Sequence, residues 1–328
     1  MATIGNCRLL CASASAYLIE TSFPNGVYRK DLRPKPTKNP DNHNTINQYN
    51  AIKLLSDPFV VVASPLKPNE FLKIEACFIG ETAEGIIISF RGTLPPIPPT
   101  AQSIADWIQN IFYANTVPYI SGYPGKVHEG FLDALLSLET GILYALSQLD
   151  PRKEKPIYLT GHSKGGAMAP IAALYFKNKS LFTANHVVTF AGPKPGDAVF
   201  ASNYDAAFPK STNFENYLDL VPFLAPGKAF IELLEKFPLL PEIIKDLLEK
   251  AAQWDYEPVG TKNVQFINKH GVIDNSFPAS NPILRFGEIL LELTKGKQGL
   301  IQVGDAHHVS CGYRYMKGVC GSSNVCTF

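Results

Sequence analysis

Ser163 stands in the run Gly161-His162-Ser163-Lys164-Gly165, which is a G-x-S-x-G pattern. A serine hydroxyl becomes an effective nucleophile only when a turn exposes it beside a base. Glycines two residues before and two after the serine keep side chains out of such a tight turn. We therefore predict that Ser163 is the nucleophile of a covalent reaction.

The residues around this pattern have the composition that a nucleophile elbow needs. PIYLT at 156–160 is typical of a buried strand, and AMAPIAALYF at 167–176 is typical of a helix. A strand, a sharp turn and a helix in that order place a serine at the edge of a sheet. The alternative, a strand-to-helix turn with an incidental serine, is disfavoured by this context.

Chain order selects the partners of Ser163, because in α/β-hydrolases the acid follows the serine and the histidine follows the acid. Asp219 comes after the strand-like NFENYL and just before Pro222, which cannot continue a strand. We predict that Asp219 orients the catalytic imidazole. The alternative is a loop carboxylate that caps a backbone amide.

Three of the seven histidines lie beyond Asp219, namely His270, His307 and His308. We predict His308 as the general base, because it lies in the polar loop GDAHHVSCGY near the end of the sequence. Adjacent side chains point apart, so only one of His307 and His308 can meet Ser163, and the pattern does not decide between them. His270, in NKHGV, is the next candidate for the general base.

The elements that must position these residues alternate between strands and helices. The pattern predicts strands over 71–80, 84–92, 185–193 and 212–222, and a helix over 127–150. Such alternation indicates a mostly parallel central sheet flanked by helices, with active residues at the carboxyl ends of its strands. We predict one α/β-hydrolase domain over 1–328, with residues 21–50 as loop.

A long insertion separates Asp219 from the predicted base. Residues 223–303 hold three helix-like stretches, and in the second Ile243, Ile244 and Leu247 share one face opposite Glu242 and Asp246. We predict a helical cap that lines an acyl pocket and opens at a lipid surface. The alternative is that these helices complete the core.

The ordered motifs ISFRGT, DWIQN, VHEGFLDAL, GHSKGG, VVTFAGPKPGD, YLDLVP and AHHVSCGY resemble those of the class 3 lipase family, over residues 60–315. The resemblance implies a triad of Ser163, Asp219 and a late histidine, placed at His308 by the spacing to Tyr313. It also implies that the backbone amides of Thr93 and Lys164 form the oxyanion hole.

The same resemblance implies an enzyme that cleaves carboxylic esters of lipids through an acyl-enzyme, as a triacylglycerol lipase or carboxylesterase without metal or cofactor. Phospholipase A1 and galactolipase activity use the same machinery and stay open. A lipase-like interaction scaffold is the alternative from another class, and the intact nucleophile, acid and base argue against it. Arg91, Asp106, Trp107 and His128 are expected to be structural.

Composition excludes several other classes. The net charge is +1, with 18% charged and 45% hydrophobic residues, which gives no basic surface for nucleic acid. A membrane-spanning helix needs roughly 20 apolar residues, and no such uninterrupted run occurs, so no transmembrane segment is expected. Asn6 and Arg8 interrupt the first apolar stretch, which favours a packed helix over a leader. The oligomeric state stays open.

The six cysteines form no C-x-x-C pair and so give no zinc signature. We expect free buried thiols in a reducing compartment, with the cytoplasm favoured over secretion. Cys311, Cys320 and Cys326 lie close together in the sequence, so a disulfide among them in an exported protein stays open.

Overall fold

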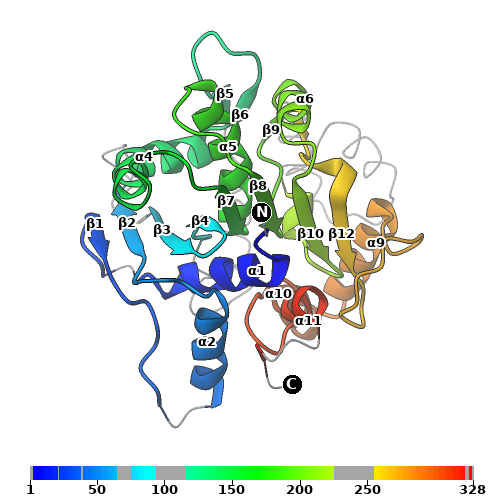
Figure 1. Ribbon diagram of the computed structural model, residues 1–328. Coiled ribbons are helices and arrows are strands. Elements are labelled where there is room, and N and C mark those ends of the chain that lie inside the picture. Colours follow the sequence, from blue (N-terminus) through cyan, green and yellow to red (C-terminus); the bar gives the residue numbers. More distant parts are fainter. Residues whose placement is uncertain are drawn as a thin grey trace.

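The computed structural model describes residues 3–20, 22–37, 40–64, 75–93, 115–224, 255–321 and 325–326. Its main element is an eight-stranded sheet, seen in Figure 1. In spatial order the strands are β1 (Gly26–Arg29), β2 (Phe59–Ala63), β3 (Glu75–Thr82), β4 (Gly85–Phe90), β7 (Ile157–His162), β8 (His186–Phe190), β10 (Thr212–Asn216) and β12 (Val264–Ile267).

Strands β4, β7, β8, β10 and β12 are parallel, and β1, β2 and β3 extend the sheet in antiparallel fashion. A second, smaller sheet has the order β11 (Tyr256–Glu257), β9 (Gly196–Asp197), β6 (Lys126–His128) and β5 (Thr116–Pro118). The predicted mostly parallel central sheet of an α/β-hydrolase is confirmed.

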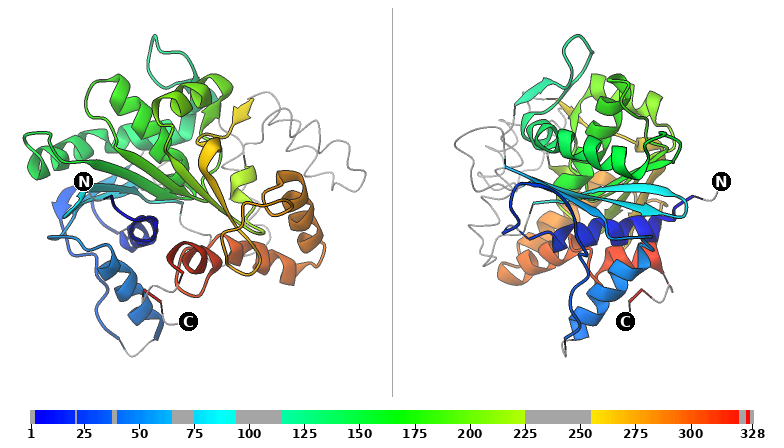
Figure 2. Two further views of the ribbon diagram at one scale, coloured as in Figure 1. Left: turned by 45° about the vertical axis from the view of Figure 1, so that its right-hand side comes forward. Right: turned by 60° about the vertical axis from the view of Figure 1, so that its left-hand side comes forward.

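Helices cover both faces of the main sheet (Figures 1 and 2). One face carries α4 (Glu129–Leu149), α5 (Lys164–Asn178) and α6 (Ala198–Ala207). The other carries α1 (Asn6–Ser15), α2 (Pro40–Ala51), α10 (Lys297–Ala306) and α11 (Arg314–Cys320), with α9 (Pro282–Leu293) near the β12 end. Short 3-10 turns are η1 (Ala16–Leu18), η2 (Val221–Phe223) and η3 (Thr261–Asn263).

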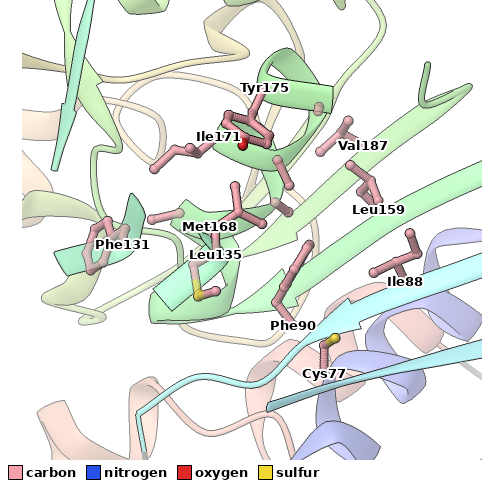
Figure 3. Close-up of a cluster of buried hydrophobic side chains, with 14 of the residues drawn as sticks. Cys77, Ile88, Phe90, Phe131, Leu135, Leu159, Met168, Ile171, Tyr175 and Val187 are labelled. Carbon is pink, nitrogen blue, oxygen red and sulfur yellow. The ribbon is translucent and has the colours of Figure 1, made fainter. Parts of the chain in front are cut away.

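The core is divided by the sheet into two layers. Ile86 and Ile88 of β4 belong to the cluster that includes α4 and α5, and part of this cluster is shown in Figure 3. Ile87 belongs to the cluster that includes α1. Successive side chains of a strand point to opposite faces, so a strand that is apolar throughout is buried on both sides. Helix α4 is long and apolar enough to cross a membrane by composition, but Leu135 and Leu138 are fully buried in the core.

The prediction that residues 21–50 are loop is wrong. Residues 21–50 are not simply loop, because 26–29 pairs with β2 as an edge strand and 40–51 is helical. The helix is rich in Asn, a poor helix former, and tertiary contacts override that propensity. Among them, Gln48 Nε2 donates to the carbonyl of Val309 at 3.1 Å.

The predicted helical cap over 223–303 is also wrong in part. Strand β12 lies inside this range and pairs with β10, so Val264–Ile267 belongs to the central sheet. A strand of four residues is too short to be recognised from the periodicity of its apolar residues. The third predicted helix is confirmed as α9, whereas residues 225–254, with the amphipathic stretch around Ile243, lie outside the described residues. Whether this region acts as a cap stays a prediction.

Four of the six cysteines are paired in disulfides, Cys7–Cys320 and Cys311–Cys326. The prediction of free thiols is correct only for Cys11 and Cys77, which are buried. The Cys311–Cys326 pair is the kind of local disulfide that the sequence left open. Cys7–Cys320 joins α1 to α11, which are neighbours only in the folded chain (Figure 1). The compartment of the protein stays a prediction.

Candidate active site

Ser163 lies on the turn between β7 and α5, as the sequence predicts. Its backbone has φ 59° and ψ −129°, a left-handed conformation that is costly for a residue with a Cβ. The turn is held by the Ser163 amide, which donates to the carbonyl of Phe190 at 3.0 Å. A strained serine at the point where a strand enters a helix is the geometry of a nucleophile elbow.

Backbone packing explains the two glycines of the pattern. A Cβ on Gly161 would lie 2.2 Å from the carbonyl oxygen of Gly165, and a Cβ on Gly165 would lie 2.2 Å from that of Phe90. Both distances are far below van der Waals contact, and the obstacle is backbone rather than a movable side chain. The glycines are therefore required for α5 to start so close to β4 and β7.

The segment after β4 reaches the elbow at Gly92. A Cβ on Gly92 would lie 3.1 Å from the Cβ of Ser163 and 2.1 Å from the hydroxyl of Tyr17. Thr93 follows directly, and Lys164 is the first residue of α5, whose first-turn amides have no acceptor within the helix. The two predicted oxyanion donors thus belong to segments that meet at the serine, and their role stays a prediction.

The side chain of Lys164 is held by an ion pair with Glu75 of β3, and both side chains are largely buried. Arg91 belongs to the same electrostatic group, because burial lowers its pKa and Glu75 opposes that shift. Its guanidinium donates to the carbonyl of Ile19 at 2.5 Å, which agrees with the predicted structural role. Asp106 and Trp107 lie outside the described residues.

Asp219 lies three residues beyond the end of β10 and is fully buried. His307 Nδ1 donates to its two carboxylate oxygens at 3.0 and 3.1 Å. The hydroxyl of Tyr315 donates to Oδ2 at 2.8 Å, and the amide of Val221 donates to Oδ1 at 3.0 Å. A buried carboxylate with this many donors is well suited to fix an imidazole and to stabilise its protonated form.

The choice of His308 as the partner of Asp219 is wrong, because the structure pairs Asp219 with His307. His308 is exposed, and its ring stacks on Tyr313 with the centroids 4.7 Å apart. His307 directly follows the last residue of α10, Ala306, whose carbonyl accepts from Asn216 Nδ2 at 2.6 Å. This contact fixes the helix end against β10, so residue 307 faces the acid and residue 308 faces away.

The position of His307 also favours its function electrostatically. The carboxyl end of a helix carries partial negative charge, which stabilises a cation there by about 0.3–1 kcal/mol at exposed sites. An imidazolium formed at His307 would meet both that end of α10 and the carboxylate of Asp219.

Sequence reasoning missed two tyrosines near the pair, Tyr315, which donates to Asp219, and Tyr17, whose hydroxyl lies 2.8 Å from His162 Nδ1. Tyr315 lies on α11 and Tyr17 on η1, and neither stands in a catalytic motif. Burial raises the pKa of both hydroxyl groups, so they stay protonated and act as hydrogen-bond donors. The only sequence signal was aromatic residues near the two ends of the described chain.

The structure also places His128 and His270. His128 Nδ1 accepts from the amide of Phe131 at 3.3 Å and caps α4, which confirms the predicted buried hydrogen bond. His270 lies on an exposed turn after β12. Of the described His, Cys, Asp and Glu side chains, those of Cys7, Cys11 and Cys320 form the one cluster compact enough for a metal. Two of its sulfurs are already joined in a disulfide.

Comparisons with known proteins agree with this geometry. Residues 87–228 match the family model described as Lipase (class 3). A lipase of Rhizomucor miehei is 33% identical over 155 residues, which are 45% of this chain and 39% of that protein. Residues 87–228 belong to the class 3 lipase family. This class 3 lipase segment holds Ser163 and Asp219, whereas His307 lies beyond it.

Two further matches, one to a curated relative and one to a solved structure, show how far the similarity extends. A secreted mono- and diacylglycerol lipase of Fusarium solani is 31% identical over 121 residues, 36% of this chain and 32% of that protein. The chain therefore aligns with well under half the length of these curated relatives. The crystal structure of M37 lipase covers 95% of this chain and 92% of its own, with a TM-score of 0.58 and 20% identity, and so shares the fold.

Proposed function

We propose that the protein hydrolyses carboxylic esters of lipids through an acyl-enzyme formed on Ser163. The observation that carries the proposal is a serine strained on an elbow, together with His307 paired to the buried carboxylate of Asp219. The class 3 lipase match supports lipid esters as the substrate class. The mono- and diacylglycerol lipase of Fusarium solani makes acylglycerols the first candidates within that class.

In the proposed reaction Ser163 Oγ attacks the ester carbonyl while His307 Nε2 takes the hydroxyl proton. Asp219 holds the imidazole through Nδ1 and stabilises the imidazolium. The alkoxide of the tetrahedral intermediate accepts from the amides of Thr93 and Lys164, and a donor of this kind typically contributes about 3 kcal/mol. His307 then gives its proton to the leaving alcohol, and water hydrolyses the acyl-enzyme by the reverse sequence.

Substrate access requires movement. Ser163 is 1% exposed, and no described residue lies within hydrogen-bonding distance and angle of its Oγ. Nucleophile and base often meet at full hydrogen-bond distance only when substrate is bound. We propose, from the sequence pattern of residues 223–303, that this region lines an acyl pocket and opens at a lipid surface.

Active-site labelling tests the chemistry directly. A fluorophosphonate probe should label the wild-type protein at Ser163 and should not label Ser163→Ala. Hydrolysis of p-nitrophenyl esters should be lost in the same variant. A wild-type protein that is folded and yet neither labels nor hydrolyses any ester would instead support the interaction scaffold.

The substrate profile refines the proposal. Rates over p-nitrophenyl esters from acetate to palmitate, with and without emulsified triglyceride, separate lipase from esterase. A steep rise at the emulsion surface supports a lipase, and activity confined to short chains supports a carboxylesterase. Phospholipid and galactolipid substrates, compared at equal acyl chain length, test the two alternatives that use the same machinery.

A further inference from the structure

His162 lies between the nucleophile elbow and the base. It directly precedes Ser163 and is buried, and its side chain extends to the face of the sheet that carries α1 and α10. His162 Nε2 lies 2.8 Å from the carbonyl oxygen of His307, and Nδ1 lies 2.8 Å from the hydroxyl of Tyr17. The rings of His162 and His307 are 4.3 Å apart between centroids.

These contacts fix the protonation of the ring. A carbonyl oxygen can only accept, so the proton of His162 is on Nε2 and is donated to His307. Nδ1 then accepts from the hydroxyl of Tyr17. Burial, followed by the neighbouring His307, lowers the pKa of His162 well below its usual range, so the ring is neutral. A neutral ring does not repel the imidazolium that forms at His307 during the reaction.

The backbone of His307 is thereby held from two directions. Asn216 Nδ2 donates to the carbonyl of Ala306, and His162 donates to the next carbonyl. The direction of an imidazole follows from the backbone that carries it, and a misplacement of about 1 Å in a catalytic group can cost 100-fold in rate. The described side-chain contacts of His162 run to His307, Tyr17 and Tyr315. All three belong to the group around the base, so His162 acts as a support of the base.

We propose that His162, oriented by Tyr17, is a positioning residue that holds His307 in register with Ser163. This inference rests on the proposed function, because it assigns a support to the base of that reaction. Tyr17 is in turn carried by the segment that follows α1, and Cys7–Cys320 joins α1 to α11. The amino-terminal segment thus takes part in the geometry of the active site.

Glutamine and asparagine carry the same amide on side chains of different length. Substituting each of them at position 162 distinguishes a positioning role of His162 from general packing. Glutamine at 162 puts an N–H near the position of imidazole Nε2 and preserves the bond to His307. Asparagine puts its oxygen near the position of Nδ1, preserves the bond from Tyr17 and does not reach His307. His162→Gln and His162→Asn therefore each keep a different one of the two hydrogen bonds.

The measurement is kcat and KM for a p-nitrophenyl ester. The enzyme concentration is taken from titration of Ser163 with a fluorophosphonate, so that unfolded protein does not lower the apparent kcat. We expect the kcat of His162→Asn to fall about 10- to 100-fold with KM unchanged. His162→Gln should exceed His162→Asn by at least about tenfold, and Tyr17→Phe should lie between His162→Asn and the wild type. His186→Asn, at a half-buried histidine that begins β8, is the control and should match the wild type.

Other outcomes overturn the inference. Equal kcat values for His162→Asn and His162→Gln, or the reverse order, would mean that His162 only anchors Tyr17 or fills space. Failure of the proposed function is recognised separately, because the wild type itself would then neither label nor turn over. A wild type that labels, together with an unaffected His162→Asn, contradicts the positioning role alone.

Discussion

The two sides of the active site are built in different ways. The nucleophile side is one continuous stretch from β7 through Ser163 into α5, and its shape comes from backbone groups packed against each other. The base side brings together Asp219, His307 and Tyr315 from separate parts of the chain, and side-chain hydrogen bonds join them. Tyr17 reaches this group only through His162, whose ring contacts the carbonyl of His307. Side chains added to the glycines of the first side should thus act through folding, whereas substitutions on the second side should act through catalysis.

The largest expected effect distinguishes the two adjacent histidines on the base side. His307→Ala should lower kcat/KM about 10³- to 10⁴-fold, because removal of a triad member leaves only binding and the oxyanion hole. His308→Ala should stay within about threefold of the wild type, since its ring stacks on Tyr313 rather than contacting Asp219. Ester hydrolysis by the two variants checks this, and a large loss in His308→Ala alone would restore the prediction from sequence.

On the nucleophile side, a side chain added to the packed backbone should act by destabilising the fold. Gly165→Ala places a Cβ 2.2 Å from the carbonyl oxygen of Phe90, and we expect a loss of about 3 kcal/mol or more in the free energy of unfolding. Gly287→Ala in α9 is the matched control. No described atom lies within 4 Å of the added methyl there. Alanine in a helix is favoured over glycine by about 1 kcal/mol. Urea unfolding of both variants checks the pair, and similar midpoints would contradict the steric argument.

The disulfide between α1 and α11 should matter for both stability and rate. Replacing both Cys7 and Cys320 with serine should lower the free energy of unfolding by about 2–4 kcal/mol. The double variant is needed because the sulfur of Cys11 lies within 4.8 Å of both others and could pair with either.

The second disulfide supplies the comparison. Cys311 and Cys326 are 15 residues apart, against 313 for Cys7 and Cys320, so the loop-entropy account predicts a smaller loss when the second pair is replaced. Thermal unfolding and kcat of the two double variants check this. Equal losses of stability, with kcat unchanged in both, would show that the link between α1 and α11 does not support the base.

The smallest expected effect is a pH dependence of stability. The pKa of His162 in the folded protein is lowered by burial, whereas in the unfolded chain it is near 6.5. Below about pH 6.5 the unfolded state binds a proton that the folded state does not, so stability is complete above that pH and is lost as the pH falls.

His162→Gln should therefore reduce the slope of the unfolding free energy between pH 5 and pH 6.5, by at most about 1.4 kcal/mol per pH unit. Urea unfolding at several pH values measures this slope. His270→Gln, at an exposed turn, should leave the slope as it is in the wild type. An unchanged slope in His162→Gln would mean that the imidazole is not held neutral.

Local sequence was sufficient where the structure depends on neighbouring residues. The elbow, the helix over 129–149 and the strands on either side of Ser163 follow from apolar runs, glycines and a chain order that permits few arrangements. Asp219 was also found, because a proline marks the end of its segment. These features are set within about ten residues of chain, the range over which periodicity and turn residues are informative.

The sequence alone thus pointed to the serine on the elbow, to the carboxylate that His307 meets and to the class of fold, because each depends on a short contiguous pattern. Only the tertiary structure decided between His307 and His308, since their neighbours in sequence are the same and the difference comes from where Asn216 and His162 hold the end of α10. It also decided the pairing of Cys7 with Cys320 and the places of Tyr17 and Tyr315. Such contacts join residues far apart in the chain, and no local pattern carries that information.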